Sequence, residues 1–275
     1  SLVYLLPNMQ PLSFMSDVGR SGAARPIVLG HRGASHDHPE NTLLAFRAAI
    51  EQGADGVELD VMLCGSGEVV VVHDDTLARV TREAPGSHQR VRETPLGELR
   101  RFDVGRGERV PTLEQVFTEL GPNALVNVEL KSQSLLHSYE YLRLPFDDGL
   151  AQAVAKVLLR AGRLNDSGKT LVSSFDPFQL LRFQSEAKGC VPLGYLFEAG
   201  QGELMRNLYR LPLWSLAAVH PEAKLVDGPA MRGWRQRGLR VNTWTVDKPN
   251  EVATMNSHGV NAIITNRPAQ VLERL

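Results

Sequence analysis

A chain of 275 residues suits one large domain or two ordinary ones, and an α/β barrel of ~250 residues is common at this length. Hydrophobic residues make up 43% and charged residues 22%, as in globular proteins. The net charge of −1 gives no electrostatic basis for binding nucleic acid or an anionic membrane surface. No apolar run approaches the ~20 residues of a membrane span, so we expect no stable membrane association.

The N-terminal segment carries no structural signal comparable to the rest of the chain. Its apolar run, Leu2 to Leu6, is too short for a signal-peptide core and ends at Pro7. Residues 1–25 are therefore interpreted as a flexible arm before a domain at 26–275, the alternative being a short element that plugs the barrel floor. The two cysteines, Cys64 and Cys190, have no metal-ligand spacing and favour a reduced, cytoplasmic protein.

Strand-like apolar runs alternate with helical patterns, which is typical of βαβ units and a parallel sheet. A further run, Glu68–His73, follows its predecessor too closely for a parallel return and should fold back as a hairpin. Pairing about Gly65 and Ser66 would place His73 opposite Glu58. The pattern predicts a closed TIM (β/α)8 barrel with a β-hairpin after strand two. Its eight strands are Ile27–His31, Gly56–Leu63, Leu125–Leu130, Thr170–Phe175, Leu193–Phe197, Leu216–His220, Leu239–Val246 and Ala262–Thr265.

Helix signals fill the gaps between these strands. Asn41 is a candidate N-cap before an apolar helix, and Thr112 with Gln115 forms a capping-box pattern. Further helices are expected to begin at Asp176-Pro177, Pro229 and Pro249.

Two segments between the expected strands are mostly polar. The first, about 75–111, is interpreted as an insertion over the barrel mouth with a short helix at Pro95–Arg101. The second, loop 132–147, holds Tyr139 and Tyr141. We expect both segments to shape the substrate entrance.

Charged residues gather in or after the expected strands. Glu58 and Asp60 lie two residues apart in a strand, so both point to one face. At ~4 Å and an effective dielectric constant of ~20, their repulsion is of order 4 kcal/mol, so a cation should lie between them. Each acidic residue alone could be a buried ion-pair partner. Together with Glu129 they need compensation, and we interpret the three as a metal site. Their hard oxygen ligands favour Ca²⁺ or Mg²⁺.

Five segments occur in an order that resembles the glycerophosphodiester phosphodiesterase family. The resemblance extends from about Pro26 to the C-terminus and implies a barrel enzyme that uses a divalent ion. Two departures, the hairpin turn Cys64–Gly67 and Asn266 where an aspartate often stands, are not expected to supply a catalytic atom. The five segments are His31-Arg32-Gly33, Pro39-Glu40-Asn41-Thr42, Glu58-Leu59-Asp60, His73-Asp74 and Glu129-Leu130-Lys131.

These segments suggest roles in phosphate-ester chemistry. His31 and His73 would form a general acid and base pair, although the sequence leaves open which is the acid. Arg32 and Lys131 would bind the phosphate oxygens.

Other residues are assigned supporting roles. Trp244 and Phe175 could form an apolar wall for a glycerol backbone, or simply belong to the core. Glu40 could brace Arg32 or favour the start of a helix, and we assign Glu40 and Asn41 a secondary role at the site. His220, at the end of an expected strand, could also line the pocket.

The predicted function is hydrolysis of a small-molecule glycerophosphodiester to sn-glycerol 3-phosphate and an alcohol such as choline, ethanolamine or glycerol. One alternative is cleavage of lysophospholipids in the manner of phospholipase D. The polar 75–111 segment disfavours it, but the apolar and aromatic residues of the next loop leave it open, namely Leu135, Leu136, Tyr139, Tyr141 and Leu144. A non-catalytic phosphate-binding barrel is disfavoured by the two histidines. Monomer and homodimer both remain open.

Overall fold

The computed structural model describes residues 25–132, 148–166, 168–212 and 214–275. Eight parallel strands form a closed barrel in the order β1-β9-β8-β7-β6-β5-β4-β2, and pairing of β1 with β2 closes it. The predicted TIM barrel is therefore confirmed. Its strands are β1 (Ile27–His31), β2 (Gly56–Leu63), β4 (Leu125–Leu130), β5 (Thr170–Ser174), β6 (Leu193–Phe197), β7 (Leu216–Pro221), β8 (Arg240–Thr243) and β9 (Ala262–Thr265).

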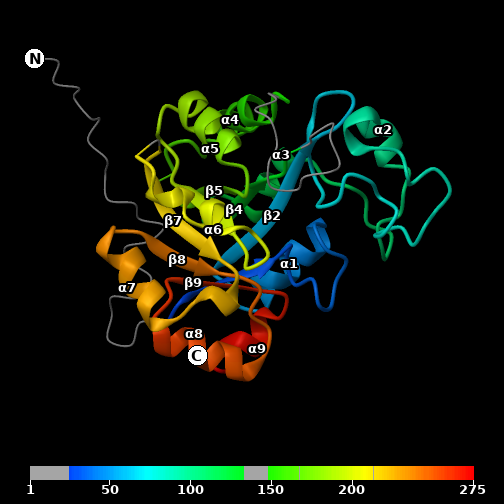
Figure 1. Cartoon of the computed structure of the whole chain (residues 1–275). Coiled ribbons are helices and arrows are strands. Elements are labelled where there is room, and N and C mark those ends of the chain that lie inside the picture. The colour runs from blue at the N-terminus through cyan, green and yellow to red at the C-terminus, as the bar shows by residue number, and fades with distance from the viewer. Residues whose placement is uncertain (1–24, 133–147, 167, 213) are drawn as a thin grey trace, which may run out of the picture.

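Helices pack around the strands, with α7, α8 and α9 on one side of the view in Figure 1 and α4 and α5 on the other. In the described part of the chain no helix is both long and apolar enough to cross a membrane. The helices around the barrel are α1 (Leu43–Glu51), α3 (Leu113–Leu120), α4 (Leu150–Arg160), α5 (Pro177–Glu186), α6 (Glu203–Arg206), α7 (Gly228–Gln236), α8 (Pro249–His258) and α9 (Pro268–Leu272), with the 3₁₀ turns η3 (Leu208–Arg210) and η4 (Ala223–Leu225).

Side chains alternate between the two faces of the barrel wall, as the period of a strand requires. Outward residues such as Val57 and Leu59 join a large core with helix residues such as Phe46 and Phe183. A separate apolar cluster, made of Ile27, Leu29, Ala262 and Ile264, comes from β1 and β9. This alternation leaves the inward positions near the strand ends for polar residues.

The hairpin after β2 is present, but its register differs from the prediction. Strand β3 (Val69–Val71) pairs antiparallel with β2, and Val71 lies opposite Val61. Continued by two residues, this register puts His73 opposite Leu59 instead of Glu58. The reason is a longer turn: Cys64 accepts from the amide of Gly67, whose φ of +92° suits a three-residue loop.

The segment 75–111 carries more apolar structure than its composition suggested. It contains the 3₁₀ turn η2 (Val91–Glu93) and α2 (Leu96–Leu99), which is shorter than the predicted helix. Figure 1 shows α2 well to one side of the barrel strands. Leu77, Val91 and Leu99 are buried in a second cluster with Met62 and Val70 of the hairpin. The hairpin and this segment therefore stabilise each other.

Two glycines permit close approaches within the barrel. Gly33 has a φ of +86°, and a Cβ there would lie 2.5 Å from the carbonyl carbon of Ala45 in α1. A Cβ on Gly194 in β6 would lie 2.4 Å from Nε2 of His220. His220 therefore occupies the barrel interior and accepts a 3.0 Å hydrogen bond from Asn242, and it does not line the main cavity.

Acid should destabilise the fold through His220. Burial lowers the pKa of His220 to about 3, against ~6.5 in an unfolded chain. The contribution of neutral His220 to the free energy of unfolding is fully present above pH ~6.5. It is lost as the pH falls toward 3, because in that range only the unfolded state takes up the proton. Between pH 7 and 5 the loss should be about 2 kcal/mol. Urea unfolding at both pH values should show a smaller loss in His220→Gln, and an equal loss would contradict this account.

Arg25, the first described residue, belongs to the folded domain. Its guanidinium makes two hydrogen bonds with Asp55, at 2.6 and 2.9 Å, where β2 begins. The predicted arm otherwise lies outside the described residues. We expect a chain that begins at Arg25 to fold and to keep its activity, because every motif residue follows it. A melting temperature lowered by more than a few degrees would contradict this expectation.

Candidate active site

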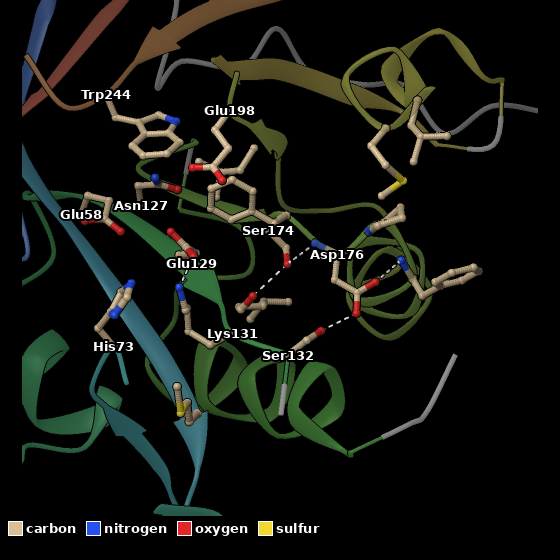
Figure 2. Close-up of a pocket in the computed structure, with 18 of the residues that line it drawn as sticks. Glu58, His73, Asn127, Glu129, Lys131, Ser132, Ser174, Asp176, Glu198 and Trp244 are labelled. Carbon is tan, nitrogen blue, oxygen red and sulfur yellow. Dashed lines mark hydrogen bonds and ion pairs between the residues drawn. The ribbon is translucent and has the colours of Figure 1, made fainter. Parts of the chain in front are cut away.

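A cavity of about 770 Å³ lies at the C-terminal ends of the barrel strands, the end at which TIM barrels hold their active sites. Part of its lining is shown in Figure 2. Asp60, Glu40 and Asn41 lie behind this surface. The other eight residues predicted for the site line it: His31, Arg32, Glu58, His73, Glu129, Lys131, Phe175 and Trp244.

Three carboxylates meet at this end of the barrel. Glu58 and Asp60 come from β2 and Glu129 from the neighbouring β4, in which Glu129 pairs with Asp60. One oxygen of each lies within 4.8 Å of the others, and all three side chains are buried. The two-residue step between Glu58 and Asp60 therefore does place both carboxylates on one face, and the pairing of β2 with β4 adds Glu129.

Two cations compensate this cluster. The Arg32 guanidinium lies 3.1 Å from Asp60 and 3.0 Å from Glu40. The Lys131 ammonium lies 2.9 Å from Glu129 and 3.8 Å from Asp60. Burial alone would raise the pKa of Asp60, but Lys131 and Arg32 outweigh it and hold that pKa below its usual range. Both cations thus contact carboxylates as well as the cavity.

Glu58 is the least compensated of the three carboxylates. Burial, with the charges of Asp60 and Glu129, raises the pKa of Glu58 well above its usual value. With all three ionised, the cluster and its two cations keep one net negative charge. A divalent cation would reverse this to one net positive charge, which matches a phosphodiester anion. The donor set and the charge balance therefore fit a hard divalent ion.

His31 is fixed in one tautomer by Asn266. The Asn266 amide donates to Asp247 at 2.6 Å, which turns its oxygen toward Nδ1 of His31 at 2.7 Å. That oxygen can only accept, so Nδ1 carries the proton and Nε2 is left unprotonated, 3.9 Å from Glu58. Burial, followed by the charge of Arg32, lowers the pKa of His31 to about 4. This histidine is therefore neutral and able to accept a proton.

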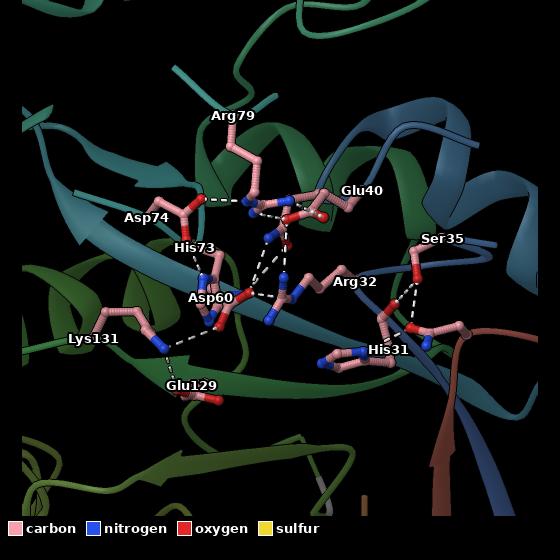
Figure 3. Close-up of polar contacts among 12 residues, drawn as sticks. His31, Arg32, Ser35, Glu40, Asp60, His73, Asp74, Arg79, Glu129 and Lys131 are labelled. Atoms are coloured by element: carbon pink, nitrogen blue, oxygen red, sulfur yellow. Dashed lines mark hydrogen bonds and ion pairs between the residues drawn. The ribbon is translucent and has the colours of Figure 1, made fainter. Parts of the chain in front are cut away.

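His73 has a charged partner instead. Its Nδ1 lies 2.6 Å from Asp74, which also accepts from Arg79 at 2.6 Å. The hydrogen bond from His73 is the largest of several effects that lower the pKa of Asp74, so this carboxylate is ionised. An ionised carboxylate at Nδ1 orients the ring and stabilises an imidazolium. Figure 3 shows His73 and His31 on either side of Arg32 in this view.

Glu40 and Asn41 support the site from behind. Glu40 accepts from Arg32 at 3.0 Å and from Arg79 at 2.7 and 2.8 Å, so it braces Arg32 as one interpretation proposed. Asn41 donates to Asp60 at 2.9 Å. The prediction that Asn41 caps α1 is wrong: the cap is Thr42, whose hydroxyl accepts from the amide of Ala45.

Phe175 and Trp244 form one aromatic wall of the cavity. Their rings meet edge to face with centroids 5.5 Å apart. Trp244 directly follows β8, where only an isolated bridge to Glu222 continues the pairing, and its indole donates to the carbonyl of His220 at 2.8 Å. Both residues line the cavity, in agreement with the interpretation that they form an apolar wall.

Several residues at the site were not assigned a role from the sequence. Asn266, Asp247 and Arg79 orient the predicted residues, and the signal for Asn266 was its place directly after the last strand. Asn127 lines the cavity two residues before Glu129, and both of its amide atoms are buried without a partner within the described structure. Tyr139 and Tyr141 lie outside the described residues.

A (β/α)8 barrel with carboxylates, two histidines and two cations around one cavity belongs among the phosphate-ester enzymes built on this fold. The family model for the glycerophosphoryl diester phosphodiesterase family matches residues 31–270. The chain belongs to this family, so the resemblance predicted from the motifs is confirmed.

Individual relatives agree with this assignment. A glycerophosphodiester phosphodiesterase of Caldanaerobacter subterraneus subsp. tengcongensis is 32% identical, over 90% of this chain and 97% of its own. The structure of an Oleispira antarctica phosphodiesterase in complex with the product sn-glycerol-3-phosphate matches with a TM-score of 0.75 and 27% identity, over 91% of this chain and 96% of its own. Family and relatives support hydrolysis of glycerophosphodiesters as the activity.

Proposed function

We propose that this protein hydrolyses glycerophosphodiesters to sn-glycerol 3-phosphate and an alcohol, with Ca²⁺ or Mg²⁺ held by Glu58, Asp60 and Glu129. The observation that carries the proposal is the buried carboxylate cluster, which shares one cavity with histidines from two different segments. The sn-glycerol-3-phosphate in the similar Oleispira antarctica structure supports the choice of product.

The two histidines would move the protons of the reaction. His31 accepts one from the attacking hydroxyl at Nε2, since Asn266 holds its other nitrogen protonated. His73 donates one to the leaving alkoxide, since Asp74 stabilises its charged form. The new bond joins the attacking oxygen to phosphorus, and the bond between phosphorus and the alcohol oxygen breaks. Both proton transfers are needed near neutral pH.

The second requirement of the reaction is stabilisation of the negative charge on the phosphoryl oxygens. Arg32 and Lys131 line the cavity and supply positive charge. When bound, the divalent ion would add Lewis-acid stabilisation of the phosphoryl oxygens. Asn127, whose amide group lacks a partner in the described structure, offers a further hydrogen bond inside the cavity.

A turnover screen tests the proposal. Glycerophosphocholine, glycerophosphoethanolamine and glycerophosphoglycerol would each be incubated with the protein and Ca²⁺, Mg²⁺ or chelator, and sn-glycerol 3-phosphate would be measured. We expect release from at least one diester with one of the two metals. No release from any diester under any condition would refute the proposed function.

A further inference from the structure

Arg79 contacts two carboxylates, and each of them also contacts a residue of the active site. Its guanidinium donates to Asp74 at 2.6 Å and to Glu40 at 2.7 and 2.8 Å. Asp74 also lies 2.6 Å from Nδ1 of His73, and Glu40 also accepts from Arg32 at 3.0 Å. Figure 3 shows Arg79 between Asp74 and Glu40. Arg79 is not among the described residues that line the cavity, so its effect on a substrate must pass through other side chains.

The three hydrogen bonds use the whole guanidinium of Arg79. Nε donates to Oδ2 of Asp74, while Nη1 and Nη2 donate to the two oxygens of Glu40. A two-pronged contact of this kind fixes direction as well as distance. Burial alone would raise the pKa of Glu40, but the hydrogen bonds from Arg79 and the charge of Arg32 outweigh it and hold that pKa below its usual value. Glu40 therefore meets both arginines as a carboxylate.

The backbone that carries Arg79 is fixed, which separates this contact from an ordinary surface ion pair. Such pairs contribute little because ordering two long side chains costs entropy. Arg79 is 50% exposed, but Leu77, two residues before it, is buried in the second apolar cluster, and its amide donates to the carbonyl of Ser87 at 3.0 Å. The carbonyl of Leu77 accepts from the amide of Thr81 at 3.0 Å, which closes a turn around Arg79. The fold therefore already fixes part of the geometry.

The two segments that Arg79 joins, one after β1 and one after β3, diverge from a single strand. The amide of Arg32 donates to the carbonyl of Glu58 at 2.9 Å, and the amide of Val72 donates to the carbonyl of Asp60 at 3.0 Å. Both acceptors belong to β2 and are two residues apart. Beyond these points both segments continue as turns and irregular backbone. Their side chains therefore need contacts other than strand pairing to keep a fixed relative position.

We propose that Arg79 is a positioning residue that holds the proposed acid and a phosphate-binding cation of the site in a fixed relative position. Through Asp74 it orients His73, and through Glu40 it orients Arg32. The inference rests on the proposed function, which assigns His73 and Arg32 these roles. Without Arg79, each carboxylate loses a charged partner that limits its rotation. Proton donation and phosphate binding should then both weaken, and the two losses should be separable.

Kinetics with two leaving groups test this role in Arg79→Ala. On the natural diester that the wild type hydrolyses fastest, kcat should fall about tenfold, as the loss of a supporting partner often causes. KM should rise about fivefold, the upper range for the loss of one exposed ion pair. On the p-nitrophenyl ester of glycerol 3-phosphate the loss of kcat should largely disappear, because this leaving group needs little protonation. The rise in KM should remain, since both substrates present the same phosphate to Arg32.

A double variant tests the path through Glu40. Glu40→Gln should raise KM by itself, because a neutral amide holds Arg32 less firmly than a carboxylate does. If Arg79 acts on Arg32 through Glu40, adding Arg79→Ala should raise KM no further, whereas independent residues give additive effects. Additive rises in KM, measured on the same p-nitrophenyl ester, would overturn the inference.

Arg47→Ala is the matched control. Arg47 is 46% exposed and pairs with Glu119 at 3.0 Å, so it also joins two separate segments, α1 and α3, and it is not among the described residues that line the cavity. Its kcat and KM should equal those of the wild type on both substrates. Arg79→Lys covers the case in which Arg79→Ala does not fold, which melting temperatures check. One ammonium cannot replace three N–H donors directed at two carboxylates, so the same two changes should appear at smaller size.

Three results would overturn the inference and leave the proposed function standing. Two of them are wild-type kcat and KM in Arg79→Ala, or in Arg79→Lys. The third is an equal loss of kcat with both leaving groups, which a general loss of structure would cause. Absence of turnover by the wild type on every diester would instead refute the proposed function.

Discussion

Replacing either His31 or His73 by alanine should lower kcat on a natural diester by a factor of roughly 10²–10⁴, with metal binding retained. Each histidine is oriented through Nδ1 by its own partner, Asn266 or Asp74, so neither can substitute for the other. A substrate with p-nitrophenol as its leaving group needs little protonation when the bond breaks. It should therefore restore turnover in His73→Ala and not in His31→Ala.

The control for these variants is His88→Ala, because His88 pairs with Glu83 on the surface and is 70% exposed. It should retain full activity. Near-normal turnover of a natural diester in either active-site variant would contradict the acid and base pairing. Equal restoration of both variants by the activated substrate would contradict the assignment of His73 as the acid.

Chelation should abolish activity, and Ca²⁺ or Mg²⁺ should restore it. The three carboxylates keep one net negative charge after Arg32 and Lys131 are counted, which repels a phosphodiester. Glu58→Gln and Glu129→Gln should each weaken metal affinity, measured by calorimetry, and lower kcat by at least tenfold. The metal binding of each variant would be compared with that of the wild type at the same pH.

Glu114→Gln is the matched control, since Glu114 pairs with Arg160 at the surface of α3. It should change neither affinity nor rate. Full activity after exhaustive chelation, with no metal detected by elemental analysis, would refute the metal site.

The strands of the barrel and the shared face of Glu58 and Asp60 were predictable because they depend on local periodicity. Alternation in β2 determines that Glu58 and Asp60 share a face whatever the rest of the chain does. Likewise the capping box at Thr112 and Gln115 is a local pattern, and it forms as expected. Asn41 was misassigned as the cap because both Asn41 and its neighbour Thr42 are residue types that cap helices. The side chain of Asn41 instead contacts Asp60, which leaves Thr42 as the cap.

Features that depend on distant residues could not be read from the sequence. The hairpin register turned on one extra residue in its loop, at Gly67. Part of the cavity wall combines α5, α6 and η3, whose side chains show no pattern in common. The role of Asn266 required knowledge of Asp247, which selects the orientation of its amide.

The amide at position 266 has a consequence for the proton transfers that we propose. A carboxylate there would place a negative charge beside Nδ1 of His31, as Asp74 does beside Nδ1 of His73. The uncharged amide orients the His31 ring through a hydrogen bond and adds no negative charge beside it. The site thus holds one histidine oriented by a neutral amide and one oriented by a carboxylate, and the proposed base and acid roles rest on this difference.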